Sequence, residues 1–199
     1  MTVPTEEITG CRIAHDRLHV TVGTLDPDRL QAPSLLPDWT IGHLLAHLVG
    51  NGESVIRRLN GAIDGEQVEM YVGGREGRNA FIAEFSGAPL EELTDRLRHV
   101  DETIDTLLDG LDPDIWDVAV LSRDDVPVLA GDLPFQRWRE VEIHLVDLGL
   151  GHTPADWSPE LVERMLPGLI GDLRSRAEPA ALAGWLVGRA PAPELGAWL

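Results

Sequence analysis

The sequence predicts a mostly α-helical protein, a helical bundle followed by a short, mainly helical C-terminal extension. Long segments place apolar residues three and four positions apart, which is the spacing of one helix face, and glycine or proline stands between them. A chain of 199 residues suits one compact domain with a small addition. We place the bundle at residues 1–150 and the extension, which we expect to pack on it, at residues 151–199.

The composition and the net charge of the chain limit the classes of function that the protein can have. Hydrophobic residues make up 43% and charged residues 25%, the balance of an ordinary globular chain. The formal net charge of -18 repels nucleic acids and anionic lipid surfaces. No segment approaches the roughly 20 apolar residues that cross a bilayer, and the N-terminus does not resemble a signal peptide. We expect a cytoplasmic monomer or homodimer that binds small molecules and neither nucleic acid nor membrane.

The first two helices are predicted in residues 6–25 and 34–62, each with an apolar stripe at helical spacing. Asp38 and Thr40 are both suitable N-caps for the second helix. Cys11, the one cysteine of the chain, cannot form an internal disulfide. We interpret it as a structural, partly buried thiol rather than a nucleophile.

Residues 60–88 are rich in glycine and predict a loop around Gly73-Gly74, followed by a short helix. A loop of this length usually has a function or is mobile. A third long helix begins at Pro89.

A fourth long helix lies in residues 131–151, with Asp132 as its N-cap. Between the third and fourth helices, residues 114–130 alternate weakly in polarity and predict a short extended stretch. Beyond the fourth helix we expect two shorter helices, the first kinked at Pro167. Trp138 falls in the apolar stripe of the fourth helix and Trp39 precedes the second helix, so both are interpreted as packing residues.

Three residues could form a metal site. Glu140 and His144 are four residues apart in the fourth helix, so their side chains point about 40° from one another and can hold one ion together. His47 lies beside the apolar stripe of the second helix, where an imidazole without a partner is costly. His43 competes with it as the second-helix ligand. A hydrogen-bonded core histidine and a surface Glu–His contact are ordinary alternatives, so spacing alone leaves the site open.

Two segments resemble the hallmark segments of a known family. Residues 37–48 (PDWTIGHLLAHL) and 139–149 (REVEIHLVDLG) are similar to the two motifs of the mycothiol-dependent maleylpyruvate isomerase family, one of the DinB-like metal-binding four-helix bundles. The likeness covers about residues 10–150. The two motifs in this order are more specific than either alone. Members of full length carry a larger C-terminal portion, so we expect a shortened C-terminal region here.

The resemblance implies that His47, Glu140 and His144 bind zinc, and that His43 is not a ligand. Three protein ligands leave a position open, as in catalytic zinc sites, and a thiol placed there is deprotonated at neutral pH. By resemblance the thiol is mycothiol, whose thiolate adds to the cis double bond of maleylpyruvate. The bond rotates, and the thiolate leaves to give fumarylpyruvate.

Such a dianionic substrate needs local positive charge in a protein this acidic, and arginine can fork onto a carboxylate. Arg78 aligns best with the arginine that the family uses in catalysis, and Arg75 is second; a solvated loop arginine is the alternative. Arg137 lies on the same side of the fourth helix as Glu140 and is our candidate contact for mycothiol or substrate, unless it neutralises a carboxylate. Asp147 is placed to orient an imidazole, to cap the helix or to face solvent.

We therefore predict a zinc-dependent enzyme that uses mycothiol, either a maleylpyruvate isomerase or an S-transferase that joins mycothiol to an electrophile. Both use the same residues. The alternatives are a non-catalytic metal-binding bundle that acts as a sensor or partner module, and a plain bundle in which the constellation is accidental. Imidazole and carboxylate also accept nickel, iron and manganese.

Overall fold

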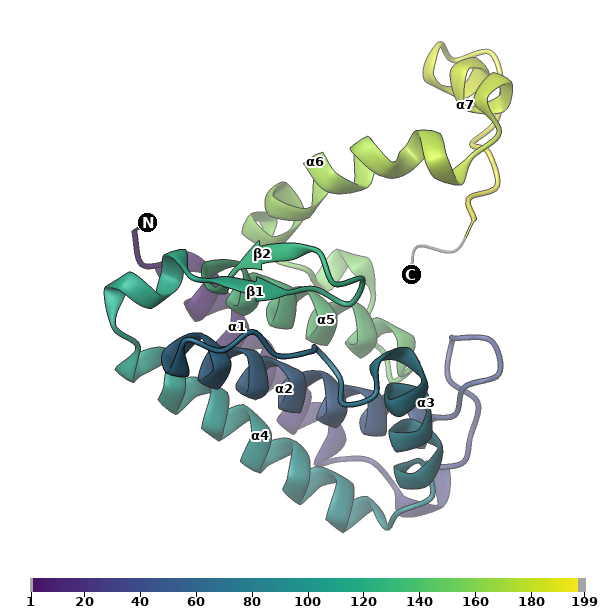
Figure 1. The fold of residues 1–199 in the computed structure, drawn as a ribbon. Coiled ribbons are helices and arrows are strands. Elements are labelled where there is room, and N and C mark those ends of the chain that lie inside the picture. The colour runs from purple at the N-terminus through teal and green to yellow at the C-terminus, as the bar shows by residue number, and fades with distance from the viewer. Residues whose placement is uncertain (1, 197–199) are drawn as a thin grey trace. The chain divides into compact units, whose positions relative to one another are not determined.

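A computed structural model of the chain describes residues 2–196, and its fold is mostly helical (Figure 1). These residues form seven α-helices and one two-stranded sheet. The chain divides into two compact units, the first ending at Asp156 and the second beginning at Trp157. No helix in the described part is both long and apolar enough to cross a membrane. The predicted helical fold class is confirmed.

Four long helices and one shorter helix build the first unit. They are α1 Thr5–Val22, α2 Ile41–Asp64, α3 Gly74–Phe85, α4 Leu90–Gly110 and α5 Leu133–Asp147. Helix α2 packs against α4 and α5, and α1 packs against α5 and α4, so the four long helices share one apolar core. Helix α3 packs on α2 (Figure 1).

Helix α2, which carries part of the site, is held at both ends. The side chain of Thr40 accepts a hydrogen bond from the backbone N–H of His43 at 3.3 Å. The His43 ring lies 3.3 Å from the backbone nitrogen of Thr40, which completes a capping box. Gly65 ends the helix with a φ of 72°, a left-handed conformation that glycine adopts without strain. Of the two predicted N-caps the structure selects Thr40, and Asp38 lies in the preceding turn.

A short hairpin connects α4 to α5. Strands β1 Ala119–Leu121 and β2 Pro127–Leu129 pair in antiparallel orientation, which confirms an extended stretch within residues 114–130. The start of that range instead belongs to a 3-10 helix, Pro113–Asp117. Asp132 holds the N-cap position of α5, as predicted, but makes no side-chain capping hydrogen bond to that helix. Its carboxylate accepts a hydrogen bond from the backbone N–H of Leu129 at 3.3 Å.

The second unit contains two helices, α6 Pro159–Arg176 and α7 Pro179–Leu186. Ser158 caps α6, because its side chain accepts a hydrogen bond from the backbone N–H of Leu161 at 3.2 Å. The helix continues through Pro167, and the kink expected there stays a prediction. The predicted extension is thus mainly helical, and its packing on the bundle stays a prediction.

One buried ionic cluster interrupts the apolar core of the bundle. Arg137 is fully buried, and its guanidinium donates to the Asp101 carboxylate at 2.7 Å. It also donates to the Leu48 carbonyl at 2.8 Å and to the side-chain oxygen of Asn51 at 2.9 Å. His15 lies 3.1 Å from the same carboxylate. These contacts supply the partners that buried charges need, and they tie α5 to α1, α2 and α4.

This cluster predicts a loss of stability in acid. Burial alone would raise the pKa of Asp101, but Arg137, His19 and His15 outweigh it and lower the pKa from 3.8 to about 2. The ionised carboxylate therefore stabilises the fold above about pH 4, and this contribution, about 2 kcal/mol, is lost as the pH falls towards 2. Urea unfolding across this range measures it. Asp101→Asn should flatten the pH dependence by the same amount, and an unchanged slope would contradict the assignment.

Helices α1 and α5 approach closely at Gly10, where a Cβ atom would meet the ring of Trp138. Trp138 is buried, which confirms its predicted role in the core. Gly10→Ala is expected to lower the free energy of unfolding by about 1–3 kcal/mol, because the ring must shift within a packed core. Gly110→Ala, where an added Cβ meets no atom within 4 Å, is the matched control. Chemical denaturation that showed equal effects for both variants would refute this account of the packing.

Candidate metal centre

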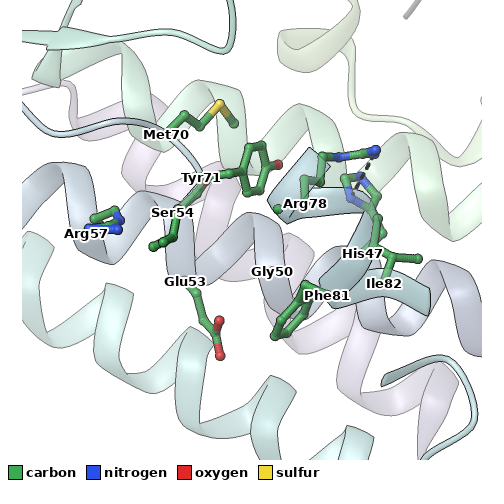
Figure 2. Close-up of a pocket in the computed structure, with 12 residues that line it drawn as sticks. His47, Gly50, Glu53, Ser54, Arg57, Met70, Tyr71, Arg78, Phe81 and Ile82 are labelled. Atoms are coloured by element: carbon green, nitrogen blue, oxygen red, sulfur yellow. Dashed lines mark hydrogen bonds between the residues drawn. The ribbon is translucent and has the colours of Figure 1, made fainter. Parts of the chain in front are cut away.

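A cavity of about 200 Å³ lies along α2 and is lined on its other side by residues 70–72 and by α3. Figure 2 shows His47 and Arg78 at one end of this lining and Arg57 at the other. The wall facing α2 comes from the glycine-rich stretch 60–88, for which the sequence suggested a function. Because His47 lines the cavity, a small molecule bound there can reach this histidine.

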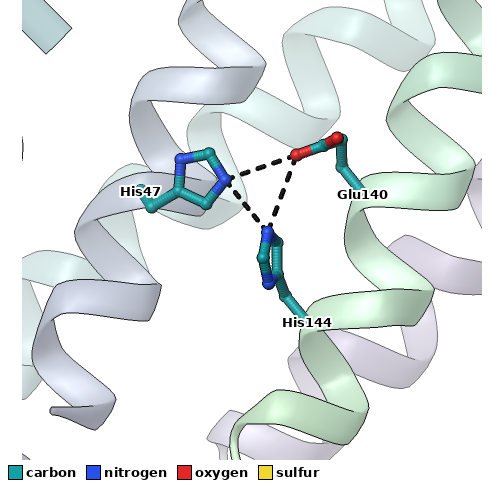
Figure 3. A group of neighbouring side chains, drawn as sticks. All are labelled: His47, Glu140 and His144. Carbon is teal, nitrogen blue, oxygen red and sulfur yellow. Dashed lines mark hydrogen bonds and ion pairs between the residues drawn. The ribbon is translucent and has the colours of Figure 1, made fainter. Parts of the chain in front are cut away.

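Three side chains from two helices converge at His47 (Figure 3). His47 comes from α2, and Glu140 and His144 lie one turn apart on α5. The Nε2 atom of His47 lies 3.1 Å from Nε2 of His144 and 3.3 Å from Oε2 of Glu140. The atoms of the third pair, His144 Nε2 and Glu140 Oε2, are 3.6 Å apart. All three residues are at most 9% exposed.

The spacing of these atoms suits one metal ion. Zinc lies about 2.0–2.2 Å from imidazole nitrogen and carboxylate oxygen, so tetrahedral geometry sets the ligand atoms about 3.3–3.6 Å apart. The observed separations of 3.1, 3.3 and 3.6 Å scatter around that range. Among the described residues, this is the one group of three potential ligands whose donor atoms all lie within 4.8 Å of one another.

A neighbouring carboxylate orients the imidazole of His144, and a guanidinium contacts the imidazole of His47. The Nδ1 atom of His144 lies 2.9 Å from Oδ2 of Asp147, which turns its Nε2 towards the cluster. Of the three roles considered for Asp147, this contact supports the orienting one. The guanidinium of Arg78 lies 3.3 Å from Nδ1 of His47. His43 instead completes the capping box of α2.

Burial and mutual contact set the charges of the cluster. Burial lowers the pKa of His47 to about 4, so its ring is neutral at neutral pH. Burial alone would raise the pKa of Glu140, but hydrogen bonds with His144 and His47 hold it well below its usual range. Burial also disfavours a charged His144, yet Asp147 and Glu140 outweigh it and raise its pKa. The carboxylates thus favour positive charge at the point where the three donor atoms meet, and a divalent cation can supply it.

Arg78 projects from α3 against two aromatic rings. Its guanidinium carbon lies 5.7 Å from the ring centre of Trp39 and 6.0 Å from that of Tyr71. The rings of Trp39 and His47 also form a T-shaped contact, with centres 5.7 Å apart. The sequence indicated only a packing role for Trp39, and the structure adds contact with the site. Arg75 is exposed and lies 3.9 Å from a hairpin carboxylate, so Arg78 is the candidate that reaches the cluster.

Two other residues considered from the sequence lie in the bundle core. Arg137, expected to contact mycothiol or substrate, directs its guanidinium to Asp101 and other protein acceptors. These contacts correspond to the alternative role of Arg137, the neutralisation of a carboxylate, and they direct its guanidinium to protein acceptors rather than to a cosubstrate. Cys11 is fully buried, more deeply than the partly buried thiol that we expected, and burial raises the pKa of its thiol. Both observations favour the structural over the reactive interpretation.

Arg58 is a buried cation near the site that the sequence analysis did not single out. It donates to the Ser54 carbonyl at 3.2 Å and to the side-chain oxygen of Gln136 at 3.1 Å. Burial lowers its pKa to about 10, while Tyr71 and Glu140 oppose the shift. Arg58 is therefore a positive charge that interacts electrostatically with the Glu140 carboxylate. Its position within the apolar face of α2 is the signal that could have found it.

Fold and site together define a helical bundle with a His–Glu–His cluster that could hold a metal ion. The family model of the mycothiol maleylpyruvate isomerase N-terminal domain matches residues 11–149, and the chain belongs to this family. The predicted resemblance is confirmed.

Solved structures agree with this assignment. The chain shares 31% sequence identity with the protein in the crystal structure of the mycothiol-dependent maleylpyruvate isomerase. The two structures superpose with a TM-score of 0.79, and the match covers 84% of this chain and 69% of that one. A histidine-to-alanine mutant of the mycothiol-dependent maleylpyruvate isomerase matches at 30% identity, with the same coverage and TM-score. Among curated proteins, none matches the chain significantly.

Proposed function

We propose that this chain is a zinc-dependent enzyme that uses mycothiol to isomerise the cis double bond of a small unsaturated keto acid such as maleylpyruvate. His47, Glu140 and His144 are the proposed ligands of the ion. The observation that carries the proposal is the convergence of the three donor atoms, together with the position of His47 on the wall of a cavity that Arg78 also lines.

His47, Glu140 and His144 would hold the zinc ion, which would act as a Lewis acid and keep a coordinated thiol deprotonated at neutral pH. The thiolate then adds to one carbon of the cis double bond, and the electron pair moves onto the conjugated carbonyl oxygen. The former double bond is now single and rotates. When the electron pair returns, the carbon–sulfur bond breaks and the trans acid leaves, so the thiol is not consumed.

The residues around the cluster have separate tasks in this scheme. Asp147 accepts a hydrogen bond from the Nδ1–H of His144, so the lone pair on Nε2 is free to bind metal. Arg78 supplies the positive charge that a carboxylate or a developing oxyanion of the substrate needs. Trp39 and Tyr71 hold the guanidinium of Arg78 at the cavity wall. No protein nucleophile is required.

An S-transferase that joins mycothiol to an electrophile would use the same residues, and thiol consumption separates the two reactions. We expect the purified protein to convert maleylpyruvate to fumarylpyruvate with mycothiol in catalytic amount and with no loss of free thiol. Stoichiometric loss of thiol with an epoxide or haloarene, without isomerisation, would favour the transferase. Metal binding with neither activity would favour a sensor or partner module.

Arg78→Gln is expected to lower kcat/KM for the acid by about 100-fold or more, because one charged donor to the developing oxyanion is lost. Metal content should stay unchanged, since Arg78 is not a ligand. Arg75→Gln, an exposed arginine of the same helix, is the matched control and should keep full activity. Steady-state kinetics with metal analysis measures both effects. Equal loss in the two variants would remove Arg78 from the mechanism.

A further inference from the structure

The end of the cavity opposite the cluster carries an arginine that the proposed chemistry does not use. Arg57 lines the cavity and is half-buried. Its side chain makes no hydrogen bond or ion pair within the described part of the chain, in contrast to its neighbour Arg58. In a protein with 34 acidic and 16 basic residues, such an unpaired guanidinium on a cavity wall has all its donors available to a ligand.

The distance between the two ends of the cavity limits what can contact Arg57. His47 and Arg57 are ten residues apart on α2, which corresponds to about 15 Å along the helix axis. A small keto acid that reacts at the cluster and contacts Arg78 is too short to reach Arg57 as well. A ligand that spans the cavity must have its reactive group at one end and a separate polar portion at the other.

The walls between these ends suit a hydroxylated ring system. Tyr71 and Phe81 present aromatic rings, and Ser54 belongs to the same lining. The Glu53 carboxylate is already paired with Arg96 at 2.9 Å, so it does not cancel the charge of Arg57. Aromatic faces pack against sugar rings, while guanidinium N–H groups donate to hydroxyl oxygens.

Mycothiol has this two-ended form, because its cysteine thiol is joined through an amide to a glucosamine–inositol disaccharide. We infer that Arg57 is a specificity-determining residue that binds the disaccharide end of the thiol cosubstrate, while the thiol end lies at the His47, Glu140 and His144 cluster. The inference rests on the proposed function. It adds a reason why the protein would prefer mycothiol to a simple cysteine derivative.

The test compares mycothiol with N-acetylcysteine and with the disaccharide part of mycothiol alone. Arg57→Gln is expected to raise the KM for mycothiol about tenfold or more, as for the loss of charged hydrogen bonds, and to leave the KM for the acid unchanged. With N-acetylcysteine, which lacks the disaccharide, wild type and variant should have the same rate. Titration calorimetry with the thiol-free glucosaminyl-inositol should show binding to the wild type that Arg57→Gln weakens by a similar factor.

Arg98→Gln, the same charge change at an exposed site on α4, is the matched control and should behave as the wild type. If the wild type binds mycothiol and Arg57→Gln binds it equally well, the inference is wrong and the proposed function stands. If the variant raises the KM for the acid instead, Arg57 contacts the substrate and the inference is also wrong. If the wild type binds neither mycothiol nor the disaccharide, the proposed function fails together with the inference.

Discussion

His47→Ala is expected to lose its bound metal and essentially all turnover. The imidazole Nε2 of His47 is one of three donor atoms that converge within 4.8 Å, and no other side chain of α2 belongs to that group. Loss of a residue that merely orients a ligand typically costs about 10–100-fold in metal affinity, so loss of a ligand itself should cost more. Metal analysis after dialysis, combined with the isomerisation assay, measures both losses.

His43→Ala is the matched control, because His43 lies one turn earlier on the same helix. Its ring contributes to the capping box of α2, so its loss should cost about 1 kcal/mol of stability. Metal content and kcat should stay at wild-type values. If His43→Ala lost the metal, or if His47→Ala kept it, the ligand assignment would be wrong.

Arg137→Met is expected to lower the free energy of unfolding by about 3–5 kcal/mol. The substitution leaves the Asp101 carboxylate, 2% exposed, without the guanidinium that lies 2.7 Å from it. Urea denaturation of the metal-free protein measures the loss without a contribution from bound ligand. The double variant Asp101→Leu with Arg137→Met should recover much of it, because an apolar pair of similar volume carries no unpaired charge.

The same variant separates the two roles considered for Arg137. If Arg137 belongs only to the core, Arg137→Met should keep the wild-type KM for mycothiol at temperatures where it is folded. A raised KM with little loss of stability would restore the original expectation that Arg137 contacts the cosubstrate.

Local patterns in the sequence predict the helices and half of the site. The helical spacing of apolar residues places the long helices to within a few residues, and the separation of Glu140 and His144 places both on one helix face. The choice between His43 and His47 required the family resemblance. In the structure the physical difference is plain, since His43 folds back on Thr40 while His47 faces α5.

The contacts that sequence analysis missed join residues far apart in the chain. Arg137 and Asp101 are 36 residues apart, and nothing local to either shows that they form an ion pair. Arg78 and His47 are 31 residues apart, and the glycine-rich loop that brings them together has no periodic pattern to read. The same loop forms the cavity wall opposite Arg57, so the sequence does not show that Arg57 lines a cavity.

The proposed function depends on a metal ion that His47, Glu140 and His144 hold and that is open to a thiol. The most direct measurement is a crystal structure of the mycothiol complex with diffraction data collected at the zinc absorption edge. We predict one anomalous peak between the three side chains, with the mycothiol sulfur as the remaining ligand and the disaccharide extending along α2. No peak at this position, or a peak whose remaining ligand is a protein side chain, would contradict the account.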